Sequence, residues 1–121
     1  MISRETRATA SPMTDAIPTL ARLAATIESR KGGNPNESYV AKLFDRGPDY
    51  AARKLGEEAV ETVVAALAGS DEELIGEAAD VIFHLAVLLS ARDLSIADAL
   101  AELDRREGLS GIAEKAARDS K

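Results

Sequence analysis

Two acidic pairs at helical spacing have the residue types that bind a divalent cation. They are Glu58-x-x-Glu61 and Glu77-x-x-Asp80, and a Gly-Ser break at 69–70 separates them. Residues three apart on an α-helix are neighbours on one side, so each pair presents its two carboxylates together. Mg²⁺ is a hard ion that prefers oxygen ligands and keeps several waters. We therefore expect two facing helices to bind Mg²⁺ between these four carboxylates.

The second acidic pair lies at the start of a strongly apolar segment. Residues 78–89 are apolar nearly all round apart from Asp80 and His84, and no Lys or Arg occurs from 73 to 91. Such a helix is expected to be buried, and a buried carboxylate is costly unless it is neutralised, paired or bound to metal. A metal explains the pair well, and a structural network of acids is the alternative. For Glu57 and Glu72 taken alone, a solvated acidic stripe is the simpler interpretation.

His84 is the only histidine and lies one turn after Asp80. It either orients a carboxylate by a hydrogen bond or is a core histidine whose ring nitrogens are satisfied. A di-iron bundle is disfavoured because that site needs Glu-x-x-His on two helices, whereas here Asp80-x-x-x-His84 occurs once. Glu73 shares the same helix edge and has no assigned role.

Basic side chains near the acids are candidates for phosphate binding. Lys42 and Arg46 are one turn apart, and Lys54 comes just before the first acidic pair. The alternative for Lys54 is an ion pair with Glu57 or Glu58, three or four residues further along the helix. Gly56 within a helix costs about 1 kcal/mol relative to Ala, which suggests that something approaches the backbone closely there.

The elements that position these residues are all predicted to be helices. Pro18 suits a first turn, Ser38 suits an N-cap, and Ser70 with Glu73 matches a capping box. Gly47 followed by proline indicates one helix ending and the next beginning at once. The pattern predicts helices over residues 17–31, 38–46, 48–68, 71–91 and 95–107, and a partly helical tail over 109–121. Residues 1–16 are expected to form a flexible arm on one all-α domain, residues 17–121.

Composition limits the functional classes. The 121 residues suit one domain, and the absence of cysteine excludes disulfides and Cys-ligated zinc. A net charge of −6 argues against a general nucleic-acid binder. The N-terminus lacks the apolar segment of a signal peptide, and no uninterrupted apolar run reaches the length expected of a bilayer span. We therefore expect a cytoplasmic protein with neither a nucleic-acid nor a membrane partner.

The acidic motif resembles that of the all-α nucleotide pyrophosphohydrolase superfamily, which includes MazG-like and dimeric dUTPase-like enzymes. The closer resemblance is to the phosphoribosyl-ATP pyrophosphatase family of histidine biosynthesis. It rests on Ser38-Tyr39-x-x-Lys42-Leu43 and on the Gly-Glu-Glu context of the first acidic pair. The resembling segments are residues 19–23, 38–43, 54–61, 77–85 and 105–108. They span residues 18 to about 117 and leave only the arm outside.

This resemblance implies a Mg²⁺-dependent hydrolase that converts phosphoribosyl-ATP to phosphoribosyl-AMP and pyrophosphate. It also implies a MazG-like antiparallel helical bundle completed by formation of a homodimer. Under this hypothesis the metal ligands are Glu58, Glu61, Glu77 and Asp80, and Glu57 orients or deprotonates the attacking water. Glu58 counts both as a ligand and as a catalytic residue, while Lys42, Arg46 and Lys54 bind phosphates.

Three alternatives remain at this point. A house-cleaning nucleotide pyrophosphatase of the same superfamily would share the chemistry and differ in substrate. A non-catalytic helical dimer would use the acids as a structural or protein-binding patch. A fragment of a bifunctional enzyme is the third, although a chain with no Cys and one His has no zinc cyclohydrolase site of its own.

Overall fold

The fold is all-α, as predicted. The computed structural model describes residues 13–107 and 111–119, and in that part of the chain every regular element is a helix. This part of the chain contains six helices where four or five were expected, because the tail forms one of its own. They are α2 (Met13–Ser29), α3 (Tyr39–Arg46), α4 (Pro48–Ala68), α5 (Asp71–Ala91), α6 (Ile96–Arg106) and α7 (Gly111–Asp119).

Side-chain caps set the starts of three helices. The hydroxyl groups of Ser38, Ser70 and Ser95 accept hydrogen bonds from backbone N–H groups of the first turns of α3, α5 and α6. Ser70 bonds the N–H of Glu73, as the sequence pattern predicted. At Ser95 a complete capping box forms with Asp98, which sequence analysis did not identify. These caps satisfy N–H groups that otherwise have no partner within a helix.

The start of α2 differs from the prediction. The helix begins at Met13 rather than at residue 17, so Pro18 lies inside it and not in its first turn. A proline removes one backbone hydrogen bond without forcing a helix to begin there, and Asp15 in the first turn complements the helix dipole. Residues 13–16 of the expected arm are therefore helical, and residues 1–12 lie outside the described residues.

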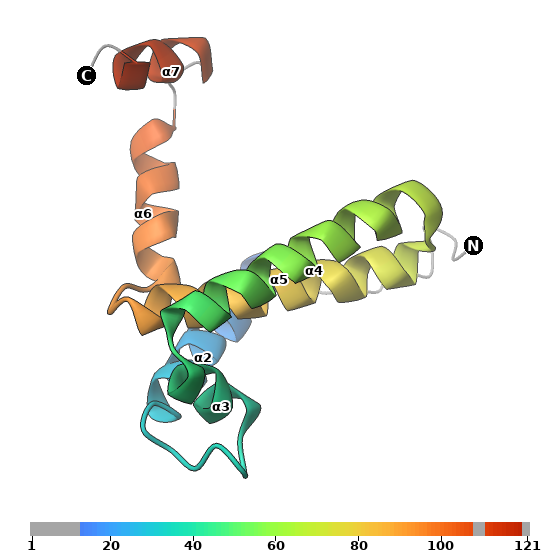
Figure 1. Ribbon diagram of the computed structural model, residues 1–121. Helices are drawn as coiled ribbons and strands as arrows, with labels where there is room; N and C mark the ends of the chain where they lie inside the picture. Colours follow the sequence, from blue (N-terminus) through green and yellow to red (C-terminus); the bar gives the residue numbers. More distant parts are fainter. Residues whose placement is uncertain (1–12, 108–110, 120–121) are drawn as a thin grey trace.

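The central feature is the antiparallel hairpin of α4 and α5, two helices of 21 residues each (Figure 1). The helices α2 and α3 pack against the end of the hairpin that lies away from its turn, and α6 projects from it at a steep angle (Figure 1). The hydrophobic core lies at this end and consists of Ile27, Val40, Leu43, Ala51, Ala86 and Val87. The turn end of the hairpin extends beyond this core.

The expectation that the whole apolar helix is buried was wrong. Only four residues of α5 are buried, and all lie in its C-terminal half: His84, Ala86, Val87 and Ser90. Ile75 and Ile82 are exposed, and so are Val60, Val63, Val64 and Leu67 on α4. The reason is geometric: near the turn each helix has only the other to pack against, and two helices cannot cover each other all round.

By length and composition alone, α5 would be able to span a membrane. The sequence analysis expected no segment of that kind. This is weak support for a membrane span, because a core helix of a globular fold passes the same test. The C-terminal half of α5 contributes Ala86 and Val87 to the core.

Candidate functional site

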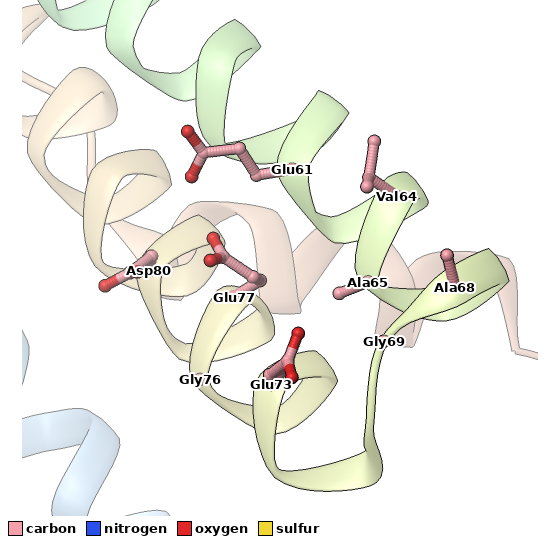
Figure 2. A pocket seen from close by; sticks show the side chains of 9 residues that line it. All are labelled: Glu61, Val64, Ala65, Ala68, Gly69, Glu73, Gly76, Glu77 and Asp80. Atoms are coloured by element: carbon pink, nitrogen blue, oxygen red, sulfur yellow. The ribbon is translucent and has the colours of Figure 1, made fainter.

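The hairpin brings the two predicted acidic pairs together. The turn at Gly69 and Ser70 reverses the chain, so that the middle of α4 faces the first half of α5. A groove of about 470 Å³ lies between the two helices. Figure 2 shows Glu61 of α4 and Glu77 of α5 reaching into the space between them. The groove is lined by Glu61, Val64, Ala65, Ala68, Gly69, Glu73, Gly76, Glu77 and Asp80.

Three carboxylates form a cluster with the spacing of a cation site. Glu58, Glu77 and Asp80 each place one oxygen within 4.8 Å of the others. One oxygen each of Glu58 and Glu77, the Oε2 atoms, is buried and has no hydrogen-bond partner among the described residues. Buried polar atoms without a partner are rare and costly, and negatively charged oxygens are the donors that Mg²⁺ takes. The cluster therefore fits a hard divalent cation.

The pKa of Glu77 also indicates a cation site at this cluster. Burial raises its pKa to about 7, and hydrogen bonding and charge repulsion from Glu61 and then Glu58 add to the effect. Neighbouring carboxylates that share one site disfavour ionisation of each other. A cation among them would reverse this effect by favouring the ionised forms.

The remaining predicted ligands occupy different environments. Asp80 belongs to the cluster but is exposed, whereas sequence analysis expected it to be buried. The difference follows from the open sides of the hairpin near its turn. Glu61 lies outside the group of three but against Glu77, whose pKa it raises. Glu73, which had no assigned role, lines the groove one turn nearer the hairpin turn (Figure 2).

Lys54 forms the ion pair that was its alternative interpretation. Its Nζ lies 2.9 Å from Oε2 of Glu57. The hydrogen bond to Lys54 lowers the pKa of Glu57, and the same bond raises the pKa of Lys54. Lys42 and Arg46 are exposed on α3. Apart from the adjoining backbone of α4, no atom of the described residues lies within 4 Å of a Cβ built on Gly56, so the expected close approach does not come from another described part of the chain.

His84 is a core histidine with both ring nitrogens satisfied. It is 5% exposed, and its Nδ1 lies 2.7 Å from the backbone carbonyl oxygen of Asp80. Nδ1 must donate, because a carbonyl oxygen only accepts. In the neutral ring, Nε2 then accepts the hydrogen bond of the Tyr39 hydroxyl group, at 3.0 Å. Burial raises the pKa of Tyr39, which keeps that hydroxyl protonated.

This contact joins α3 to α5 directly beside the acidic cluster. The Tyr39 ring also stacks on Phe83, with ring centroids 6.0 Å apart. Sequence analysis included Tyr39 in a motif and gave it no role. Helical spacing relates residues within one helix only, so it could not pair Tyr39 with a histidine 45 positions away.

The match to known proteins decides the family. The family model described as phosphoribosyl-ATP pyrophosphohydrolase matches residues 20–107. The chain belongs to this family. The matched region contains α3, α4 and α5 complete, and therefore every residue of the acidic cluster.

Relatives named phosphoribosyl-ATP pyrophosphatase cover most of the chain. The Rhodobacter capsulatus protein is 60% identical over 99 residues, which are 82% of this chain and 96% of the relative. The Erythrobacter litoralis protein is 63% identical over 83% of this chain and 96% of its own. The Novosphingobium aromaticivorans protein is 63% identical over 84% of this chain and 94% of the relative. The family resemblance inferred from Ser38-Tyr39-x-x-Lys42-Leu43 and the Gly-Glu-Glu context of the first acidic pair is confirmed.

Proposed function

We propose that this protein hydrolyses phosphoribosyl-ATP to phosphoribosyl-AMP and pyrophosphate in L-histidine biosynthesis. The observation that carries the proposal is the group of carboxylates from Glu58, Glu77 and Asp80, two of them with a buried unpaired oxygen. It lies within the region that matches the phosphoribosyl-ATP pyrophosphohydrolase family. A site built from oxygens alone, beside an open groove, suits a cation that binds a triphosphate.

The proposed metal ligands are Glu58, Glu61, Glu77 and Asp80, and the proposed ion is Mg²⁺. When bound, a divalent ion of this kind neutralises phosphate charge and makes water a better nucleophile. The chain itself supplies two helices that keep the carboxylates within reach of one another. Ligands drawn from two rigid helices are held more accurately than ligands on loops.

The basic residues supply positive charge on the substrate side. Lys42 and Arg46 are exposed and available to phosphate oxygens. Glu57 holds Lys54 at 2.9 Å and so positions its charge near Glu58. Because the pKa of Glu57 is lowered, it is a weak proton acceptor at neutral pH. Of its two predicted roles, orienting the water therefore suits it better than deprotonating it.

The proposal extends to a cytoplasmic homodimer. Along the hairpin, α4 exposes four large apolar side chains and α5 exposes two. The four on α4 share one side of the helix by their spacing, and exposed apolar surface is typical of a protein interface. A second copy of the hairpin would cover it symmetrically, which would complete the MazG-like bundle.

Pyrophosphate release from phosphoribosyl-ATP, with and without Mg²⁺, tests the proposed function. We expect release only when Mg²⁺ is present. Glu58→Gln and Asp80→Asn keep the shape of each side chain and remove a negative ligand, so both should abolish release while the helices remain folded. Circular dichroism checks the folding. Turnover retained by both variants would contradict the assigned ligands.

The same assay separates the alternatives. A house-cleaning pyrophosphatase would prefer dCTP, dUTP or ITP to phosphoribosyl-ATP. A non-catalytic dimer would release pyrophosphate from none of these, and Mg²⁺ would not change its melting temperature. The proposed function requires phosphoribosyl-ATP to have the highest kcat/KM.

A further inference from the structure

Two arginines from different helices lie against one tyrosine ring. The guanidinium carbon of Arg46, the last residue of α3, is 4.9 Å from the ring centroid of Tyr50. That of Arg53, in α4, is 5.5 Å from the same centroid. The Tyr50 ring itself packs against the hydrophobic core. Attraction between a guanidinium group and an aromatic face restrains both long side chains, so the two charges are held close together in advance.

Within residues 13–107 and 111–119, no carboxylate oxygen lies within 4.0 Å of a side-chain nitrogen of Arg46 or Arg53. Some cations of the same region are paired, as Lys31 is with Glu28 and Lys54 is with Glu57. Two arginines without an ion pair therefore lie against one ring in a chain with a net charge of −6. Holding like charges together is unfavourable unless an anion compensates them.

The start of α4 carries charge of both signs, because Asp49 lies in its first turn. The helix begins directly after Arg46, and its N-cap residue, Gly47, provides no side-chain hydrogen bond to the first turn. N–H groups at a helix start without a cap bind anions, and the helix dipole favours negative charge there. Tyr50 lies in this first turn beside Asp49, so the positive charge of the site comes from the two arginines and not from the helix start.

This basic site and the carboxylates of α4 lie on the same half of the helix surface. At about 100° per residue, Tyr50, Glu57 and Glu61 fall within roughly 40° of one another around the helix. Glu58, the member of the acidic cluster on α4, lies about 80° from Tyr50. Tyr50 precedes Glu58 by eight residues, which is about 12 Å along the axis. Arg53 is near enough to contribute to the lowered pKa of Glu57. An elongated ligand lying along this side of α4 would meet the acidic cluster at one end and the arginines at the other.

We propose that Arg46, Arg53 and Tyr50 form a second phosphate site, which binds the monophosphate of the phosphoribosyl group while the triphosphate lies at the acidic cluster. The inference rests on the proposed function and deepens it. Phosphoribosyl-ATP carries a phosphate monoester on one ribose and the triphosphate on the other. Arginine binds phosphate through two parallel hydrogen bonds. Under this proposal Arg46 binds the monophosphate rather than the triphosphate. Arg53, which was not among the candidate residues from the sequence, binds it as well.

The site would also explain substrate choice. An ordinary nucleoside triphosphate has no second phosphate, so it would leave the arginines uncompensated. Discrimination by a missing charged group is stronger than discrimination by shape alone. The arginine pair would therefore distinguish phosphoribosyl-ATP from the nucleotides that a house-cleaning enzyme accepts.

Two substrates and two variants test this site: phosphoribosyl-ATP, and the same compound with its monophosphate removed. Arg46→Met and Arg53→Met keep apolar contact with Tyr50 and remove the charge. Each should lower kcat/KM for phosphoribosyl-ATP by roughly 10–100-fold, the effect of losing charged hydrogen bonds, chiefly through KM. Each should change kcat/KM for the dephosphorylated compound less than about twofold, because the lost contact has no partner there.

Arg30→Met is the matched control, since Arg30 is an exposed arginine at the end of α2, and it should leave both substrates unaffected. Arg53→Lys, which keeps the charge and loses the paired hydrogen bonds, should retain part of the preference if Arg53→Met folds poorly. Equal losses on both substrates, or no loss on either, would overturn the second site alone. If the unaltered protein released pyrophosphate from neither substrate, the proposed function would fail as well.

Discussion

The pKa of Glu77 depends on its burial and on the carboxylates beside it. Its pKa of about 7 exceeds its ordinary value of 4.5 because of burial and two adjacent carboxylates. Between these two values the folded protein holds a proton that the unfolded chain has released. Stability therefore decreases as the pH rises through this window, and the contribution is present in full only below it.

The first prediction concerns this pH dependence. In the absence of divalent ions, Glu77→Gln should melt at a higher temperature than the unaltered protein above pH 7, because it carries no charge there. The difference should shrink as the pH falls towards 4.5. Added Mg²⁺ should raise the melting temperature of the unaltered protein more than that of the variant. A difference that does not depend on pH would contradict the raised pKa.

Tyr39 and His84 support the site without belonging to the carboxylate cluster. The hydrogen bond between them connects α3 to α5. Removing one partner would leave the buried Nε2 of His84 unsatisfied, and the loss of such a bond costs more than the bond itself contributes.

The second prediction is that Tyr39→Phe lowers the free energy of unfolding by about 1–3 kcal/mol. Tyr50→Phe is the matched control, because the hydroxyl group of Tyr50 has no hydrogen-bond partner among the described residues. Urea titration measures both. Equal values for the two variants would show that the bond to His84 contributes little.

At the scale of the elements, the junction between α3 and α4 matters most. One residue, Gly47, ends α3 and begins α4. Its φ of 92° and ψ of 172° lie where side chains other than glycine are strained. This backbone conformation sets the direction in which α4 leaves, and so places Arg46 against Tyr50.

The third prediction compares two glycines that both have open space where a side chain would begin. Gly47→Ala should destabilise the fold by about 1–3 kcal/mol through backbone strain alone. Gly56→Ala, inside α4, should stabilise it by up to about 1 kcal/mol, because alanine favours a helix. At both residues an added Cβ would meet nothing within 4 Å, so packing does not contribute. Chemical denaturation of the two variants should give changes of opposite sign.

For the whole molecule, the decisive feature is the uncovered half of the hairpin. Leu67 is 83% exposed and Val64 is 57% exposed, although both lie in a regular helix beside the groove. A single chain leaves this surface in contact with water, at a cost that burial against a partner would recover.

The fourth prediction tests the dimer. Light scattering at micromolar concentration should give twice the chain mass for the unaltered protein and the mass of one chain for Val64→Asp. A buried charge at a symmetric interface is present twice, so one substitution should suffice. Thr26→Asp, on the exposed side of α2, should leave the mass unchanged. A single-chain mass for the unaltered protein would refute the dimer.

Local signals in the sequence were enough to place most helix ends. Ser38, Gly47 and Gly69 each act through the backbone groups of their own turn, so reading the neighbouring residues predicts them. Pro18 misled because a proline is compatible with a first turn but does not require one. The acidic pairs could be predicted for the same reason, because residues three or four apart on a helix lie on the same side of it.

Burial and contacts between helices required the tertiary structure. The sequence predicted α5 to be buried because it is apolar, but burial depends on what packs against each side, and the chain alone covers only the C-terminal half. The pairing of Tyr39 with His84 and of Arg46 with Tyr50 depends on how separate helices meet. Sequence by itself therefore determined the helices, the acidic edges and the family. Only the tertiary structure decided which carboxylates approach within reach of one ion and which cations remain unpaired, because both are distances between different elements.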